Sequence, residues 1–213
     1  MRISFLHTID GNQAVFEHAA INAGLLATQL RHDVRPDLRE AVGQGLATDG
    51  ALRDQVRDVV RNLAEDADAV IVTCATLGPV VDSIQDWPAP VIRADVALAK
   101  AAATASAGKP IVVLCAVAST VDTNRALFEQ HAQASGASVA VRLVPDAWAI
   151  FQAGDRSACL QACAHAAQEA YAQGAEVVAF AHPWMAAAGA LVQGQRQPLD
   201  AARAALHAGL QTR

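Results

Sequence analysis

A cysteine at the end of an apolar run is the residue of this chain best placed for chemistry. Cys74 follows the β-branched run at residues 70 to 72, and Gly78 and Pro79 then favour a tight turn into a helix. A thiol between a strand and a helix lies near unsatisfied backbone N–H groups and the positive end of the helix dipole. This setting favours the thiolate, the form that takes up a proton or attacks carbon. The alternative interpretation is a small, buried apolar residue.

The neighbours of Cys74 are suited to hold an anion. Thr73 and Thr76 carry hydroxyl groups, and the backbone amide of Ala75 precedes the first bonds of the expected helix. Hydroxyls and free amides together bind carboxylates well. We therefore predict that Thr73, Ala75 and Thr76 hold the carboxylate of a substrate beside the Cys74 thiol.

A similar run later in the chain has no cysteine. The segment VVAFAHPWM (177–185) aligns with the segment around Cys74 at a shift of 181 − 74 = 107, which places Ala181 opposite Cys74. Ala181 has no acid or base. The next residue, His182, has a side chain that gives or takes protons near neutral pH, so it is the candidate partner of Cys74. The alternative is a histidine at a helix start, held by Pro183.

Short apolar runs alternate with amphipathic segments along the chain, a pattern typical of βα units and parallel sheets. The clearest amphipathic helix is expected after the cap candidates Thr48 and Asp49. Its apolar face carries Leu52, Val56, Val59, Val60 and Leu63. We expect strands near residues 2–7, 29–34, 69–73, 90–93, 110–115, 138–144 and 176–180, with a weak eighth strand near 197–199.

The two halves of the chain contain similar segments in the same order. ADAVIVTCA (67–75) matches GAEVVAFAH (174–182), and the segment from residue 89 matches that from residue 196 at the same shift of 107. VFEHAA (15–20) matches LFEQHA (127–132) at a shift of 112. Matches in order and at nearly constant spacing indicate a duplicated unit of about four βα pairs. The alternative is chance similarity between alanine-rich segments.

These patterns predict an α/β protein of two pseudosymmetric lobes. Each lobe is a roughly four-stranded parallel sheet flanked by helices, and the active-site cleft is expected between them, beyond the carboxyl ends of the strands. The first lobe is predicted to take residues 1–95, with residues 195–213 returning to it, and the second to take residues 96–194.

Three segments carry a resemblance to a known family. VTCATLG (72–78), VVAFAHPWM and PVIRADVALAKAA (90–102), set in duplicated α/β halves, resemble the aspartate/glutamate/hydantoin racemase superfamily over nearly the whole chain. The resemblance implies an enzyme without a cofactor, in which two cysteines flank an acidic carbon beside a carboxylate. One cysteine removes a proton as thiolate, and the other delivers a proton from the far side.

The same resemblance implies further substrate contacts. The hydroxyls of Ser119 and Thr120, after the fifth strand, are expected to face the substrate, and the end of the first strand is expected to contribute His7 or Thr8. Because this chain lacks the second cysteine at Ala181, it resembles a single-cysteine variant of the superfamily.

Three functions remain open at this point. His182 replaces the missing thiol and racemisation or epimerisation is kept. Alternatively, Cys74 alone serves decarboxylation or isomerisation of a small carboxylic acid, as in relatives resembling arylmalonate decarboxylases and maleate isomerases. Finally, the protein binds a small acid without turning it over. The favoured prediction is a racemase-like isomerase that acts on a small carboxylic acid, such as an amino acid or a related acid, through the Cys74 thiol.

Composition excludes several other classes of function. The 213 residues carry a net charge of −5, the pI is about 5.7, and no basic cluster supports nucleic-acid or anionic-membrane binding. The start MRISFLHTIDGN does not resemble a signal peptide, and no apolar stretch approaches the ~20 residues of a membrane span. We predict a cytoplasmic protein, and the family resemblance allows a homo-oligomer.

Other reactive residues fit structural roles better. Cys159, Cys163 and His165 form a C-x3-C-x-H pattern, but one helix from a cap at Asp155 would place both thiols on one face and His165 elsewhere, so no metal site is predicted. Cys115 ends an apolar run and is expected in the core.

Three further expectations concern the surroundings of the site. Trp148 and Phe151 form either a wall of the substrate pocket or a packing contact. His32 is expected to be a surface or packing residue. The glycine-rich segment 42–50 is expected to be a loop that closes over the cleft.

Overall fold

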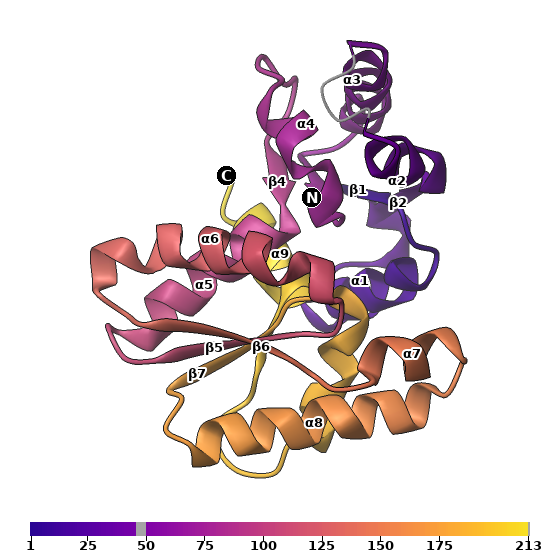
Figure 1. The fold of residues 1–213 in the computed structure, drawn as a ribbon. Coiled ribbons are helices and arrows are strands. Elements are labelled where there is room, and N and C mark those ends of the chain that lie inside the picture. The colour runs from indigo at the N-terminus through magenta and orange to yellow at the C-terminus, as the bar shows by residue number, and fades with distance from the viewer. Residues whose placement is uncertain (46–49, 213) are drawn as a thin grey trace. The chain divides into compact units, whose positions relative to one another are not determined.

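The fold is that of a computed structural model, which describes residues 1–45 and 50–212 (Figure 1). Unit 1 contains β1 (Ile3–His7), α1 (Gly11–Asn22), η1 (Ala27–Gln29), β2 (Leu30–Val34), α2 (Pro36–Gly43), α3 (Gly50–Ala64), β3 (Ala69–Val72), η3 (Ala75–Leu77), α4 (Gly78–Asp82), β4 (Val91–Arg93) and the start of α5 (Ala94–Ser106). Unit 2 follows with β5 (Ile111–Cys115), η4 (Ala118–Thr120), α6 (Val121–Ala132), η5 (Gln133–Ser135), β6 (Val139–Leu143), α7 (Ala147–Gln152), α8 (Arg156–Ala172), β7 (Val177–Phe180), η6 (Pro183–Leu191) and β8 (Leu199–Asp200). The last helix is α9 (Ala201–Leu210), and elements labelled η are 3₁₀ helices.

The chain forms two compact units, which confirms the predicted α/β class with two parallel sheets. Unit 1 comprises Met1–Ala97 and Ala202–Arg213, and unit 2 comprises Leu98–Ala201. Nearly all of α9 therefore belongs to unit 1. The second boundary comes later than the residue 194 expected from the sequence, because β8 pairs with β7 and keeps the segment before α9 in unit 2.

The sheet of unit 1 has the strand order β2-β1-β3-β4, and all of its strands are parallel. On one face, Leu6 and Val72 pack against apolar side chains of α2, α3 and α4. On the other face, Phe5 contacts Phe16 of α1, and Gly209 of α9 lies against isoleucines of β1, β3 and β4. Alternation of side chains along each strand thus supplies two different layers.

The sheet of unit 2 has the order β6-β5-β7-β8, again with all strands parallel. Leu114 and Phe180 pack against α7, α8 and η6 on one face. Figure 1 shows α8 along that face of β5, β6 and β7, with α5 and α6 on the other face. The same strand order in both units supports the duplication that the sequence patterns indicate.

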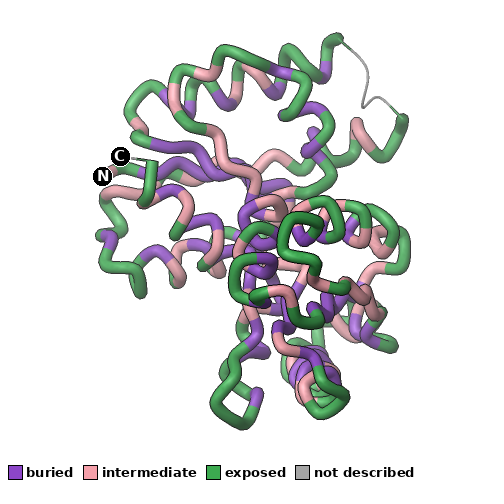
Figure 2. The backbone as a smooth tube through the Cα atoms, turned by 90° about the vertical axis from the view of Figure 1, so that its left-hand side faces the viewer, coloured by how far each residue is buried: buried purple, intermediate pink, exposed green. Residues whose placement is uncertain are grey.

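The predicted strands are confirmed, and each begins and ends within two residues of its expected range. Central strands read as continuous apolar runs because helices cover both faces of each sheet. Figure 2 shows this as buried strands inside each unit and exposed outer faces of the helices. The helix α3 buries Leu52, Val56, Val60 and Leu63, as its pattern predicts, whereas Val59 is only half-buried.

Two sequence expectations fall partly or wholly outside the described residues. Thr48 and Asp49, the cap candidates of α3, lie there, and so does the middle of the segment 42–50 that was expected to form a loop. In the part of the chain that the structure describes, no helix has both the length and the apolar character needed to span a membrane.

Gly209 of α9 offers a test of the packing in unit 1. A Cβ at this position would meet Ile92, Ile3 and Ile71 at 3.4, 3.7 and 3.8 Å, which is ordinary contact, and its φ is not in the left-handed region. We expect Gly209→Ala to raise the free energy of unfolding by about 0.5–1 kcal/mol, because alanine restricts the unfolded chain and fills this space. Urea unfolding measures the change.

Gly136, which ends η5 with φ of 70°, is the matched control. Alanine there must adopt a left-handed conformation, so Gly136→Ala should lower stability by about 1 kcal/mol. A destabilising Gly209→Ala would show that α9 packs differently against the sheet.

Candidate active site

Strand register determines which residues end β3 and β7. In unit 1, Ile3 of β1 pairs with Ala69 of β3, and in unit 2, Ile111 of β5 pairs with Val177 of β7. Equivalent residues of the two units therefore differ by 108 in residue number, since 111 − 3 = 108 and 177 − 69 = 108. The ladder continues one residue further in both units. The Thr73 N–H donates to Leu6 O at 3.0 Å, and the Ala181 N–H donates to Leu114 O at 3.0 Å.

The position equivalent to Cys74 is therefore His182, and the prediction that Ala181 occupies it is wrong. The sequence shift of 107 does hold for the fourth strands, β4 and β8. Arg93 of β4 pairs with Val72, and Asp200 of β8 pairs with Phe180, so Arg93 and Asp200 are equivalent. The connection from β7 to β8 is one residue shorter than that from β3 to β4, so one shift cannot align both strand ends. Thr73 is the true counterpart of Ala181.

The local backbone supports this equivalence. Cys74 is the N-cap of η3 with φ −107° and ψ 112°, and His182 is the N-cap of η6 with φ −105° and ψ 132°. The Leu77 N–H donates to Cys74 O at 3.2 Å, and the Met185 N–H donates to His182 O at 3.0 Å. Each unit thus has one of the predicted site residues at the start of a 3₁₀ turn that follows its third strand in sequence.

Cys74 is the thiol that solvent can reach. Its side chain packs against the apolar cluster under α2, α3 and α4, but the residue is only half-buried, whereas Cys115, Cys159 and Cys163 are buried. Ala75 and Thr76 beside it are exposed. Their N–H groups precede the first hydrogen bond of η3 and so have no partner within that turn.

Thr73 and His7 face the opposite layer from Cys74 and bond to each other. The Thr73 hydroxyl donates to Leu6 O at 3.2 Å, and so it accepts from His7 Nδ1–H at 3.0 Å. His7 Nε2 in turn accepts from His32 Nδ1–H at 2.9 Å. The hydrogen of the Thr73 hydroxyl is therefore engaged within the unit rather than free for a carboxylate.

Burial keeps this histidine pair neutral. His7 is fully buried, and desolvation, reinforced by the neighbouring His32, lowers the pKa of His7 to about 3. Desolvation also lowers the pKa of His32, opposed by the charge of Glu17. The rings of His7, His32 and Phe5 stack at centroid distances of 4.7 to 5.8 Å. His32 therefore belongs to a buried polar network, a role that its sequence context does not reveal.

Three polar side-chain atoms of unit 1 are buried without a hydrogen-bond partner among the described residues. They are Thr8 Oγ1, Asn12 Oδ1 and His32 Nε2. Thr8, predicted as a substrate contact, is buried in this structure. Unpaired buried polar groups cost free energy, and His32 Nε2 is the one of the three that belongs to the histidine network.

His182 has one ring nitrogen engaged by the backbone. The Val117 N–H donates to His182 Nε2 at 3.3 Å, which leaves the hydrogen of the neutral ring on Nδ1. Desolvation lowers the pKa of His182 to about 4, so the ring is neutral near pH 7. It lies parallel to Trp184 at a centroid distance of 5.5 Å. A neutral imidazole with Nδ1–H serves as a hydrogen-bond donor to a carboxylate or an enolate oxygen.

Aromatic side chains surround the Trp184 ring within unit 2. Phe151 stacks on Trp184 at 4.3 Å, and Trp148 stacks on Phe151 at 5.6 Å. All three rings pack against the core of unit 2. The packing contact expected for Trp148 and Phe151 is therefore present, and a role as a pocket wall stays a prediction.

Ser119 and Thr120 lie on η4, at the carboxyl end of β5. The Thr120 hydroxyl donates to Val117 O at 2.7 Å, so its hydrogen is engaged, whereas Ser119 is exposed. Cys115 lies beneath them, and burial raises the pKa of its thiol to about 11 against a weaker opposing hydrogen bond with Thr120. Cys115 is thus a core residue, as expected.

Arg93 is a residue of this region that the sequence patterns did not single out. Its guanidinium donates to both oxygens of Asp95, at 2.6 and 3.2 Å, and also pairs with Asp82 at the end of α4. A Cβ at Gly78 would clash with this guanidinium, so a larger residue in the turn after Cys74 would displace the Arg93 side chain. The only sequence signal is a charged residue at the end of the apolar strand β4.

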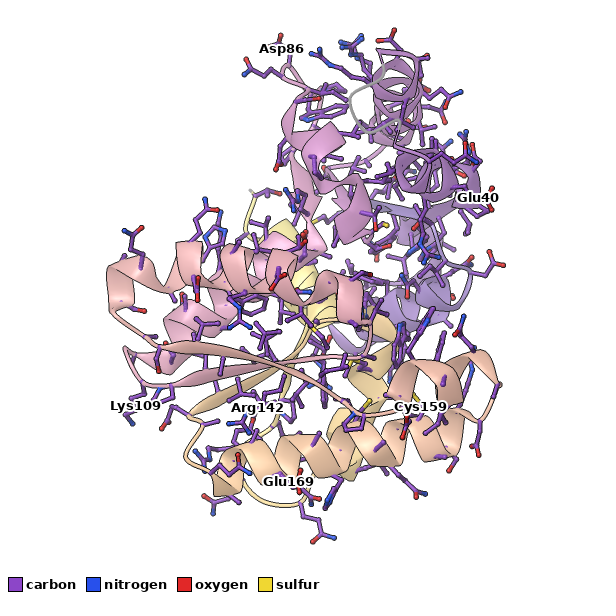
Figure 3. The ribbon with its side chains drawn as sticks, in the orientation of Figure 1. Glu40, Asp86, Lys109, Arg142, Cys159 and Glu169 are labelled. Carbon is purple, nitrogen blue, oxygen red and sulfur yellow. The ribbon has the colours of Figure 1, made fainter. Side chains whose placement is uncertain are left out.

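The C-x3-C-x-H pattern behaves as a helix pattern. Cys159 and Cys163 are buried in the core of unit 2, and the Cys159 thiol donates to Ala147 O at 3.3 Å (Figure 3). His165 is exposed and pairs with Glu169 at 3.3 Å. Asp155 caps α8 as predicted, since its carboxylate accepts from the Ala158 N–H at 3.0 Å. Across the described residues, no three side chains of suitable type gather to hold a metal ion.

Two racemases and a racemase homologue are among the solved structures that superpose on nearly the whole chain. The aspartate racemase of Picrophilus torridus superposes with a TM-score of 0.70 at 10% sequence identity, covering 99% of this chain and 93% of that one. An aspartate racemase homologue from Pyrococcus horikoshii OT3 gives 0.63 at 12% identity, with 99% and 97% covered. A glutamate racemase from Bacillus anthracis gives 0.62 at 13% identity, with 99% and 81% covered.

The chain has the fold of the aspartate and glutamate racemases. No protein-family model matches its sequence. No curated protein matches it either. The resemblance stated from short motifs is thus confirmed at the level of the fold, across nearly the full chain.

Within this racemase fold, the predicted site residues form separate groups. Cys74, Ala75 and Thr76 lie together on the turn after β3, while His7 and Thr73 bond to each other in the layer next to α1. Ser119, Thr120 and His182 are neighbours in unit 2, because Val117 links η4 to the His182 ring.

The buried histidines predict an acid-sensitive fold. The folded pKa of His7 lies below its unfolded value of about 6.5, so the unfolded chain binds more protons, and stability is complete above pH 6.5 and falls as the pH drops towards 3. One such histidine costs up to about 2 kcal/mol between pH 7 and pH 5. Urea unfolding at both pH values measures the loss.

His7→Gln should show a smaller loss between pH 7 and pH 5 than the unsubstituted protein. The matched control is His165→Gln, whose side chain is 74% exposed, and it should keep the original pH dependence. Equal losses in all three proteins would contradict a neutral, buried His7.

Proposed function

We propose that this protein is a cofactor-independent enzyme that moves a proton at the carbon beside the carboxylate of a small acid, with Cys74 as its acid–base group. The observation that carries the proposal is the half-buried thiol at the end of β3, in a chain whose other thiols are sealed in the core. A thiolate there has the substrate's carboxylate held by the free amides of Ala75 and Thr76 and by the Thr76 hydroxyl.

His182 is the proposed partner of Cys74. It lies at the equivalent strand end of unit 2, but its neutral ring is a hydrogen-bond donor rather than a thiol that takes up a proton. Nδ1–H donates a hydrogen bond to the oxygen on which negative charge develops when the α-proton leaves. Ser119, which is exposed on the neighbouring turn, is proposed to contact the same substrate.

The proton transfer balances with one thiol. The Cys74 thiolate takes the α-proton, the electron pair moves to the carboxylate oxygens as an enediolate, and the thiol returns a proton to carbon. Decarboxylation is the second candidate reaction. It is favoured by the difference between the two strand ends, which carry one thiol and one imidazole. In decarboxylation, the bond to the leaving carboxylate breaks, its electron pair stays on the substrate, and Cys74 supplies the proton that replaces CO₂.

Proton exchange in D₂O tests the function. We expect the protein to exchange the α-proton of at least one acid in a panel of small amino acids and dicarboxylic acids, followed by NMR. Cys74→Ala should lower the rate at least about a hundredfold, the range of general acid–base catalysis. Cys163→Ala, which removes a buried thiol instead, is the matched control and should exchange like the unsubstituted protein.

Release of CO₂ from 2-substituted malonates, measured on the same variants, identifies the decarboxylase alternative. Binding of an acid with neither exchange nor CO₂ release would contradict an enzymatic function and support a binding protein. Exchange that continues in Cys74→Ala would remove the thiol from the mechanism.

Substitution of His182 separates its two ring nitrogens. His182→Asn keeps a donor near the position of Nδ1, and His182→Gln keeps an acceptor near Nε2 for the Val117 N–H. If Nδ1–H stabilises the developing charge, His182→Asn should retain more exchange activity than His182→Gln, with the difference in kcat. The opposite order would mean that the Val117 contact, and hence the position of the turn, is what matters.

A further inference from the structure

A polar hollow lies on unit 1, formed by one face of α3 and the loop between α4 and β4. Its lining residues are Arg53, Arg57, Arg61, Ser83, Gln85 and Asp86, and its volume is about 520 Å³. Asp86 marks the tip of that loop in Figure 3. None of these residues belongs to the candidate active site, and a volume of this size matches small-molecule sites, which typically measure roughly 300–1,000 Å³.

Three arginines on one helix face create an unusual local charge. Arg53, Arg57 and Arg61 are spaced by four residues, so their side chains are neighbours on α3. Like charges at this spacing destabilise a helix. The cost is partly relieved at Arg57, which pairs with Asp54 at 2.6 Å, but Arg53 and Arg61 form no ion pair with any residue that the structure describes.

The lining has the chemistry of an oxyanion site. Guanidinium groups stay charged at physiological pH and bind phosphate or carboxylate oxygens in pairs. The Gln85 amide adds further donors, whereas the Ser83 hydroxyl already donates to Val80 O at 2.7 Å. The Asp86 carboxylate opposes an anion, so the four charged groups of the lining sum to 3 − 1 = +2, or +1 when Asp54, the ion-pair partner of Arg57, is included, in a chain whose net charge is −5.

We propose that this hollow binds a small multivalent oxyanion of the phosphate or pyrophosphate class, at a site separate from Cys74. An anion with several oxygens can accept hydrogen bonds from more than one of these guanidinium groups, which favours it over a single carboxylate. Bound there, it replaces the repulsion between neighbouring arginines by charge-assisted hydrogen bonds.

Calorimetric titration with sodium pyrophosphate tests the proposal. We expect saturable binding with a dissociation constant below about 1 mM at 50 mM NaCl, and severalfold weaker binding at 200 mM NaCl because the site is exposed. The triple substitution Arg53→Gln, Arg57→Gln and Arg61→Gln should weaken binding at least about tenfold, since it removes three charged donors.

Two variants provide controls. Arg39→Gln removes an exposed arginine from α2 and should bind pyrophosphate like the unsubstituted protein. Asp86→Asn removes the opposing charge and should bind more tightly, and asparagine tolerates the left-handed backbone at this position, where φ is 64°. Asp86→Asn keeps the proposal testable if the triple variant fails to fold, as judged by circular dichroism.

The outcomes are distinct. Weaker binding in the triple variant, tighter binding in Asp86→Asn and no change in Arg39→Gln support the site. Absence of saturable binding up to about 10 mM, or unchanged binding in the triple variant, overturns it. Binding of RNA or an acidic peptide without any binding of pyrophosphate also overturns it, because the partner would then be a macromolecule. The α-proton exchange activity should be unaffected in every variant, so failure here leaves the proposed function standing.

Discussion

The hydrogen-bond ladder between the first and third strand of each unit is the constraint on which the site depends. In a parallel sheet, the pairing register fixes which residue is the last to bond and which residue follows it. Here the last bonds are those from Thr73 to Leu6 and from Ala181 to Leu114. The residues after them, Cys74 and His182, leave the sheet at the same point and with similar backbone angles. A slip of one residue would turn either side chain towards the opposite layer of its unit.

The same ladder divides polar side chains between two environments. Thr73 lies on the layer next to α1, where burial keeps His7 and His32 neutral. His32 is hydrogen-bonded to His7, and His7 is hydrogen-bonded to Thr73. Cys74 lies on the other layer, at the edge of an apolar cluster, where solvent can reach it. The histidine network bonded to Thr73 and the solvent-accessible thiol of Cys74 are therefore kept apart, although Thr73 and Cys74 are adjacent in sequence.

The two units also differ in the chemistry of their turns. After Cys74, Ala75 contributes an N–H group, whereas Pro183 after His182 has none. His182 is tied to the neighbouring turn through the Val117 N–H and lies against Trp184, while no corresponding aromatic residue follows Cys74. The equivalent strand ends of the two units thus carry different groups, a solvent-accessible thiol in one and a neutral imidazole in the other.

Much of the fold could be predicted from the sequence, because buried parallel strands are continuous apolar runs and α8 has a clear cap at Asp155. The position of Cys74 at a strand end was predictable for the same reason. The equivalence of Cys74 and His182 could not be predicted. The connection from β7 to β8 is one residue shorter than that from β3 to β4, and a comparison of similar segments at one constant shift does not detect a one-residue difference. Nor do local patterns reveal the contacts of His32, whose partner His7 is distant in sequence, or of Arg93, whose partners Asp82 and Asp95 come from the elements before and after its strand.

The register of β7 and the role of the strand ends can be tested together by adding a thiol at either neighbouring position. His182→Cys places a second thiol at the counterpart of Cys74, and Ala181→Cys places it at the counterpart of Thr73. The measurement is deuterium incorporation into both enantiomers of an accepted acid. The account predicts that His182→Cys exchanges both enantiomers and interconverts them, while Ala181→Cys does not. Interconversion by Ala181→Cys alone would contradict it.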